Sequence, residues 1–162
     1  ARPYGIVDSQ ENRPWVALFG TNKLATVDAK GKIHEVELPR EGARPRRLDI
    51  TDDGQLWYVD YAEGFLGRYD ISSGDIHEWP MPGGPDSRPY AMALDDQDRP
   101  WFVETGVTPN RLIGFDPQTE TFSQPATIPS GGGTVRHMVF DPDKRALWFG
   151  TDTNTMVRAT LQ

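Results

Sequence analysis

The chain has 162 residues and contains no cysteine. This absence excludes disulfides, thiolate metal sites and a cysteine nucleophile, but it does not separate compartments, because cytosolic and exported proteins can both lack cysteine. No apolar run approaches the roughly 18 residues that a membrane-spanning helix needs. Residues 1–20 also lack the basic and then apolar layout of a signal peptide. We therefore expect no membrane insertion.

Several sequence motifs of catalysis and nucleic-acid binding are also missing. The chain has no glycine-rich phosphate loop, no Gly-x-Ser-x-Gly elbow and no His-Glu-x-x-His pair. The glycines at 131–133 lie between two expected strands, which favours a flexible loop. The net charge is −7 and the basic residues are scattered, which excludes a nucleic-acid partner. With 36% hydrophobic residues, the chain is still able to bury a core.

The chain does contain a tandem repeat, marked by four tryptophans. Trp15, Trp57, Trp101 and Trp148 are 42, 44 and 47 residues apart, and each stands thirteen residues after the start of a similar phrase. The phrases begin at Arg2, Arg44, Arg88 and Val135. A period in this range is typical of arrays of supersecondary units such as β-propeller blades.

Each repeat reads as four short strands separated by turn residues. Acidic, glycine and serine residues between the apolar runs supply the backbone conformations that tight hairpins need. The expected strands are 3–8, 13–18, 23–28, 33–38, 45–50, 55–60, 65–70, 75–80, 89–94, 99–104, 111–115 and 121–126, with residues 156–159 as the third strand of the last repeat. No segment shows helical periodicity, so we expect almost no helix.

These features predict an all-β fold made of β-propeller blades of four antiparallel strands. We expect one domain, residues 1–162, with repeats at about 1–43, 44–87, 88–133 and 134–162. Three repeats are complete, and the fourth lacks its outer strand. The tryptophans begin the apolar half of each second strand, where a large ring can fill the space between neighbouring sheets.

Three motifs carry a resemblance to a known family. The phrase Arg-Pro-Tyr at 88–90, the run Trp-Phe-Val-Glu at 101–104 and the segment 110–116 resemble the blade signature of the streptogramin B lyases, also called virginiamycin B lyases. The resemblance covers essentially the whole chain. It implies a propeller of seven blades, roughly twice this length, with the substrate at the mouth of the central channel.

The resemblance also implies that a further strand must complete the last blade. We expect the chain to be the C-terminal part of a longer propeller, or a half-propeller that is completed by a second copy of itself. An open blade edge would otherwise expose unpaired backbone groups. A closed ring of four blades is a third alternative. A start at Ala1 without methionine leaves export with signal removal, or truncation, open.

The same position of each innermost strand holds Tyr4, Arg46, Tyr90 and His137, and we expect these side chains at the channel mouth. In the family this position supplies a catalytic tyrosine and histidines, and an acid four residues after the last tryptophan helps to hold Mg²⁺. The resemblance therefore implies His137 and Tyr90 as catalytic residues, with Asp152 as a metal ligand. Tyr90 stands where the lyases have a second histidine.

Other residues complete the expected site. We expect Tyr4, Arg46, Arg88 and Arg136 to bind a small ligand, since arginines at the mouth of an acidic protein attract anions. Glu104 is a second candidate for the metal. The alternative for the arginines of the mouth is ion pairing with Asp60 and Glu104.

Three functions stay open at this point. The first is a Mg²⁺-dependent lyase that opens a cyclic ester by β-elimination, with His137 as the base. The second is a propeller scaffold that binds a protein or small ligand without catalysis. The third is a metal-dependent lactonase or a sugar-acid enzyme of a related propeller type, which would need an acidic cluster at the channel and an asparagine ligand that the inner strands lack.

Overall fold

The computed structural model describes residues 1–161 and contains four antiparallel sheets, each formed by one repeat. Blade 1 consists of β1 (Pro3–Asp8), β2 (Pro14–Leu18), β3 (Lys23–Val27) and β4 (Ile33–Glu37). Blade 2 consists of β5 (Pro45–Ile50), β6 (Gln55–Asp60), β7 (Phe65–Asp70) and β8 (Ile76–Pro80). All eight strands lie within one residue of their expected bounds, because alternating burial and turn residues define both ends of each strand.

Blade 3 departs from the expected pattern in its outer strand. It consists of β9 (Pro89–Leu94), β10 (Pro100–Glu104), β11 (Arg111–Asp116), β12 (Thr121–Phe122) and β13 (Ala126–Thr127). The single strand expected at 121–126 is thus broken in two, and both parts pair with β11. Pro125 lies in the break and has no N–H to donate. Ser123 replaces ladder bonds there, since its hydroxyl accepts the N–H of Gly114 at 3.0 Å.

Blade 4 has three strands within the described residues: β14 (Met138–Asp141), β15 (Ala146–Gly150) and β16 (Met156–Thr160). This confirms the prediction that the last blade lacks an outer strand. β16 forms the outer edge of the sheet, and Met156 on it is 75% exposed.

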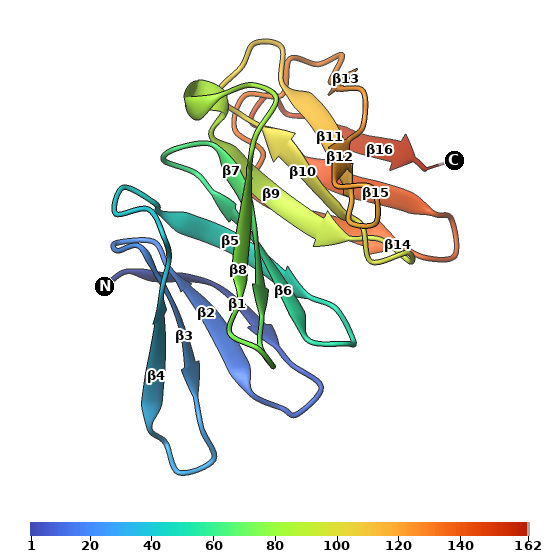
Figure 1. The fold of residues 1–162 in the computed structure, drawn as a ribbon. Coiled ribbons are helices and arrows are strands. Elements are labelled where there is room, and N and C mark those ends of the chain that lie inside the picture. Colours follow the sequence, from blue (N-terminus) through green and yellow to red (C-terminus); the bar gives the residue numbers. More distant parts are fainter. Residues whose placement is uncertain (162) are drawn as a thin grey trace.

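The four blades are arranged in an arc around a shared inner edge (Figure 1). The innermost strands β1, β5, β9 and β14 follow one another along this edge, and each contacts the next. Blade 1 and blade 4 lie at opposite ends of the arc, so the third alternative, a closed ring of four blades, is wrong. The helix in residues 1–161 is a short 3₁₀ turn, η1 (Pro85–Ser87). None of the described residues forms a helix long and apolar enough to cross a membrane.

The core consists of three apolar layers, each between two neighbouring blades. Trp15 and Trp57 are 3% and 1% exposed, which confirms their expected role in packing between blades. Trp57 on β6 lies 5.7 Å from the ring of Phe115 on β11, so it joins blade 2 to blade 3. Trp101 and Trp148 are half-buried.

A buried ionic cluster joins blades 1 and 2 near the end of β6. Arg40 lies 2.8 Å from the Asp60 carboxylate, donates from Nε and Nη2 to Glu78 at 2.9 and 3.0 Å, and also pairs with Glu63. The Tyr58 hydroxyl donates to Glu78 at 2.7 Å. Burial alone lowers the pKa of Arg40, but Glu78 and Asp60 raise it above its usual value. The cluster therefore keeps its charges paired in the folded protein.

Candidate active site at the channel mouth

A β-bulge follows the proline near the start of each of the first three inner strands. In blade 2, Pro45 pairs with Asp60 and the next pair is Arg47 with Val59, so Arg46 is an inserted residue without a partner on β6. The same shift occurs after Pro3 in β1 and after Pro89 in β9. Bulges bend a strand and redirect a side chain, and they are frequent beside active sites. Here they act on the positions of Tyr4, Arg46 and Tyr90.

Tyr4 and Tyr90 meet across the mouth, although they belong to blades 1 and 3. Their rings are 5.9 Å apart and their hydroxyl groups form a hydrogen bond. Tyr90 is 2% exposed, whereas Tyr4 is 41% exposed. The hydrogen bond to Tyr90 and the charges of Arg46 and Arg47 lower the pKa of Tyr4, while burial raises the pKa of Tyr90. Either hydroxyl can donate in this pair, and Tyr4 presents the one that faces solvent.

The Arg46 guanidinium lies among four aromatic rings. Its Cζ atom is 3.9, 4.1, 4.4 and 5.1 Å from the ring centres of Tyr90, Tyr61, Phe19 and Tyr4. Contacts of this kind attract a cation to the ring face, and they are stronger where water is excluded. Arg46 thus lies at the mouth as expected, with its charge stacked on the chain's own aromatic residues.

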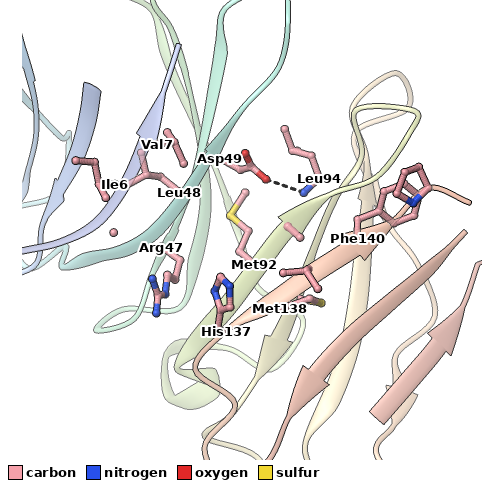
Figure 2. A pocket seen from close by; sticks show the side chains of 14 residues that line it. Ile6, Val7, Arg47, Leu48, Asp49, Met92, Leu94, His137, Met138 and Phe140 are labelled. Carbon is pink, nitrogen blue, oxygen red and sulfur yellow. Dashed lines mark hydrogen bonds between the residues drawn. The ribbon is translucent and has the colours of Figure 1, made fainter. Parts of the chain in front are cut away.

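A cavity of about 480 Å³ extends from the mouth along the inner strands (Figure 2). Arg47 and His137 lie side by side at one end of it (Figure 2). Most of the other lining residues are apolar and include Ile6, Met92 and Met138. His137 lies directly before β14 and is exposed, and its side chain forms no hydrogen bond within residues 1–161. Its imidazole is therefore free to contact a ligand.

The third polar side chain of the cavity is Asp49, farther along the inner strands. It accepts the N–H of Leu94 on β9 at 3.0 Å (Figure 2). Burial raises the pKa of Asp49, against the lowering effect of its hydrogen bonds from Leu94 and Ile50. The carboxylate thereby joins two neighbouring inner strands, which is a structural role.

Asp152 follows β15 and is paired with Arg136, which immediately precedes His137. The hydrogen bond from Arg136 lowers the pKa of Asp152. Arg136 also accepts, through its carbonyl, the Nε–H of Arg47 at 3.1 Å. The structure thus brings Asp152 to the same rim as His137, but with its charge already compensated.

Glu104 is fully buried at the end of β10, where it lies 2.5 Å from Arg111 and accepts the N–H of Gly83 at 2.7 Å. Asp60, at the same position of blade 2, accepts the N–H of Arg44 at 2.7 Å. Both acids therefore hold the backbone that connects one blade to the next. The expected pairing of these acids with arginine side chains of the mouth is wrong, because their ion-pair partners are Arg111 and Arg40.

These contacts decide whether the residues fit the metal that the resemblance implies. Magnesium needs oxygen ligands that are free to coordinate it. Asp152 is neutralised by Arg136, Glu104 by Arg111, and no group of three His, Asp or Glu side chains in the described part of the chain is arranged to hold a metal ion. The described residues therefore do not fit a magnesium site as they stand.

Arg88 lies beside the mouth rather than in it. Its backbone is left-handed, with φ of 46°, and its carbonyl accepts the Thr105 hydroxyl at 2.7 Å. Its side chain lines a second cavity, of about 420 Å³, together with Tyr61 and Thr134. Tyr61 lies between this second cavity and the mouth, because its ring also contacts Arg46.

Sequence reasoning missed Phe19 and Tyr61 as members of the mouth. They stand four residues after Trp15 and Trp57, at the position that Asp152 holds after Trp148. A comparison of this position across the repeats gives Phe19, Tyr61, Thr105 and Asp152. The two aromatic residues in that series are the sequence signal from which this part of the mouth could have been predicted.

The blades consist of antiparallel strands and are arranged in an arc, which defines a β-propeller. Polar and aromatic side chains gather at one end of the inner strands, and they form a candidate site at the channel mouth. Residues 1–159 match the model of the virginiamycin B lyase family, and the chain belongs to this family. The resemblance seen in the sequence is thereby confirmed. No curated protein sequence matches the chain.

Solved structures agree with this assignment. A streptogramin B lyase structure is 25% identical with a TM-score of 0.82, and the match covers 99% of this chain and 55% of that one. A catalytically inactive virginiamycin B lyase from Staphylococcus aureus with quinupristin is 27% identical with a TM-score of 0.81, covering 98% and 55%. A putative 6-phosphogluconolactonase from Bacteroides uniformis, 11% identical with a TM-score of 0.79 and covering 99% and 50%, shares the fold. The chain thus spans about half the length of the lyase structures it matches.

Proposed function

We propose that the protein is a carbon–oxygen lyase that opens a cyclic ester at the channel mouth. The observation that carries the proposal is the convergence of the Tyr4–Tyr90 pair, Arg47 and His137 at one end of the channel, in a chain of the virginiamycin B lyase family. The apolar lining beyond them suits the side chains of a depsipeptide.

In the proposed reaction an imidazole nitrogen of His137 takes the proton from the carbon next to a carbonyl group. The electron pair of that C–H bond forms a carbon–carbon double bond, and the neighbouring C–O bond breaks. The ester oxygen leaves with its electron pair as part of a carboxylate. Histidine suits the first step because its neutral form is available near pH 7.

Tyr4 and Arg47 stabilise the negative charges that develop on the substrate oxygens during the reaction. When Tyr90 donates to Tyr4, the Tyr4 proton is free to be donated to the carbonyl oxygen as it becomes negative. The Nε–H of Arg47 is held by the Arg136 carbonyl, so the end of its guanidinium is positioned beside His137. We assign it to the leaving carboxylate, since planar guanidinium groups bind carboxylates well.

The direct test is incubation of the protein with quinupristin, followed by mass spectrometry of the separated products. Elimination gives a linear product with the mass of the substrate, whereas hydrolysis adds the mass of one water molecule. The assay is run with added Mg²⁺ and with a chelator, which tests the magnesium dependence that the family implies. Unchanged substrate under both conditions would exclude this activity.

The variant His137→Ala is expected to lower the turnover number by about 100-fold or more, because it removes the proposed base. The matched control is His34→Ala, an exposed histidine of β4 paired with Asp28 on the far side of blade 1. The control is expected to keep wild-type turnover. Equal turnover of the two variants contradicts the assignment of His137.

The charge pairing of Asp152 and Glu104 favours a second candidate, a propeller that binds a small ligand at the same mouth without catalysis. Calorimetric titration with quinupristin separates the two functions. Binding without any product supports the binding module, whereas binding followed by the isomeric linear product supports the lyase.

We also propose that the two end blades are covered by the remainder of a longer propeller or by a second copy of the chain. Support comes from exposed apolar side chains on these blades that do not line the channel cavity: Ile33 in blade 1 is 65% exposed, and Met156 in blade 4 is 75% exposed. The edge of β16 also presents backbone N–H and C=O groups that can pair with a strand of another segment or chain.

For the 162-residue chain alone, we expect a solution mass of two chains by light scattering. The cause is burial of the end blades and of the β16 edge against each other. Met156→Lys, which places a charge on this edge, is expected to return the mass to that of one chain. A wild-type monomer at all concentrations would show that a second copy does not cover these blades, and would favour the remainder of a longer propeller.

A further inference from the structure

Arg46 differs from the other arginines of the mouth because four aromatic rings of the chain surround its guanidinium. The four rings around its guanidinium belong to β1, β9 and the residues that follow β2 and β6, so three blades contribute to one cage. Its Nε atom is buried and has no hydrogen-bond partner in residues 1–161. Arg46 as a whole is half-buried, and a partly desolvated cation without carboxylate partners is costly unless the rings compensate it.

Two of the four rings are the hydrogen-bonded pair. Tyr4 and Tyr90 lie on either side of the Arg46 side chain along the inner edge, since β5 is flanked by β1 and β9. Tyr61 packs edge-on against Tyr90 at 5.8 Å, and Phe19 lies 6.0 Å from both Tyr4 and Tyr61. The rings therefore contact one another around a single cation, and moving any of them disturbs the Tyr4–Tyr90 pair.

We propose that Arg46 is a positioning residue, which holds the Tyr4 and Tyr90 rings together so that Tyr4 directs its proton to a ligand at the mouth. The catalytic role of Arg46 rests on the proposed function, whereas its effect on the position of the two tyrosine rings is a property of the free protein. A phenol held beside a cation is a stronger hydrogen-bond donor to an oxygen that becomes negative in the transition state.

The charges that face Tyr4 come from two segments, β5 and the residues before β14. Arg46 and Arg47 lie on β5, with Cζ atoms 5.1 and 5.2 Å from the Tyr4 ring centre, and Arg136 precedes β14. Tyr90 on β9 supplies the hydrogen bond. The charge of Arg136 is paired with Asp152, and the Nε–H of Arg47 is donated to the Arg136 carbonyl. Arg46 is therefore the cation whose position depends most on the tyrosine rings.

The test is a spectroscopic titration of tyrosine ionisation, which needs no substrate. Burial raises the pKa of Tyr58, Tyr69 and Tyr90, so the first of these phenols and Tyr4 to ionise is Tyr4. Loss of this step in Tyr4→Phe assigns it. Arg46→Gln is expected to move the Tyr4 midpoint up by about one pH unit, because an opposite charge at this distance is removed. Arg46→Lys keeps a charge and is expected to shift the midpoint less.

The matched control is Arg68→Gln, because Arg68 is stacked on two rings, Trp57 and Trp79, away from the tyrosine pair. It is expected to leave the Tyr4 midpoint unchanged. An unchanged midpoint in Arg46→Gln overturns the proposal, as does an equal shift in Arg46→Gln and Arg68→Gln. If Arg46→Gln does not fold, Phe19→Leu removes one wall of the cage and is expected to raise the midpoint by a smaller amount.

A second measurement ties the cage to turnover. If quinupristin is opened, Arg46→Gln is expected to lower kcat at least tenfold with KM within twofold of wild type, because a transition-state interaction is weakened. A rise in KM alone would show that Arg46 binds substrate instead, and would overturn the positioning role. If no substrate is opened, the proposed function fails while the titration still decides the role of Arg46.

Discussion

The variant Arg40→Met is expected to lower the free energy of unfolding by about 3–5 kcal/mol. Arg40 compensates Asp60, which is fully buried, and Glu78, whose side chain is 9% exposed. Without the guanidinium these carboxylates stay buried with no cation, and the charge of Glu63 nearby increases the repulsion. Urea unfolding followed by circular dichroism measures the loss.

Arg145→Met is the matched control, because Arg145 pairs with Asp96 at the surface, where the side chains are 37% and 36% exposed. A surface pair of this kind contributes about 0–1 kcal/mol. Adding Glu78→Gln to Arg40→Met removes one uncompensated charge and is expected to recover part of the loss. If the Arg40 and Arg145 variants lose the same stability, the buried cluster is not what joins blades 1 and 2.

The variant Trp57→Ala is expected to cost about 3–5 kcal/mol, which is typical of a large buried aromatic residue. The indole is 1% exposed, stacks on Trp79 at 5.7 Å and contacts Phe115 of the next blade. Its removal leaves a cavity between the sheets of blades 2 and 3. The same unfolding experiment measures this cost.

Trp148→Ala tests whether the cost depends on the neighbouring blade or on the residue type. Trp148 has the same place in its repeat, but it is half-buried and its ring contacts Arg158 of its own sheet at 5.9 Å. We expect a loss of about 1–2 kcal/mol, in the range of ordinary substitutions. Equal losses at both positions would contradict the role of Trp57 between blades.

The fold was predictable because its signals are local. The turn between β5 and β6 needs a residue with positive φ, and Gly54 supplies it with φ of 86°, while Asp98 adopts φ of 57° at the corresponding turn of blade 3. Alternating burial then defines each strand. The broken outer strand of blade 3 was the error, because Pro125 removes a donor inside a segment that otherwise reads as a strand.

The candidate site was predictable in its location and much less in its contacts. The repeat placed Tyr4, Arg46 and Tyr90 at one end of the channel, since equivalent positions of adjacent blades lie together. Which group pairs with which depends on side chains that are far apart in the sequence. Arg46 meets rings from three blades, and Asp152 meets Arg136 instead of a metal, and neither contact has a signature in a single repeat.

The bulges after Pro3, Pro45 and Pro89 separate two tasks within each inner strand. Residues after the bulge keep the alternation that packs one sheet against the next, whereas the inserted residue is outside that alternation. Its side chain can therefore be exchanged without a matching change in the core. The composition of the mouth is in this sense modular: substitutions at three positions, one to a blade, would give the same scaffold a different ligand preference.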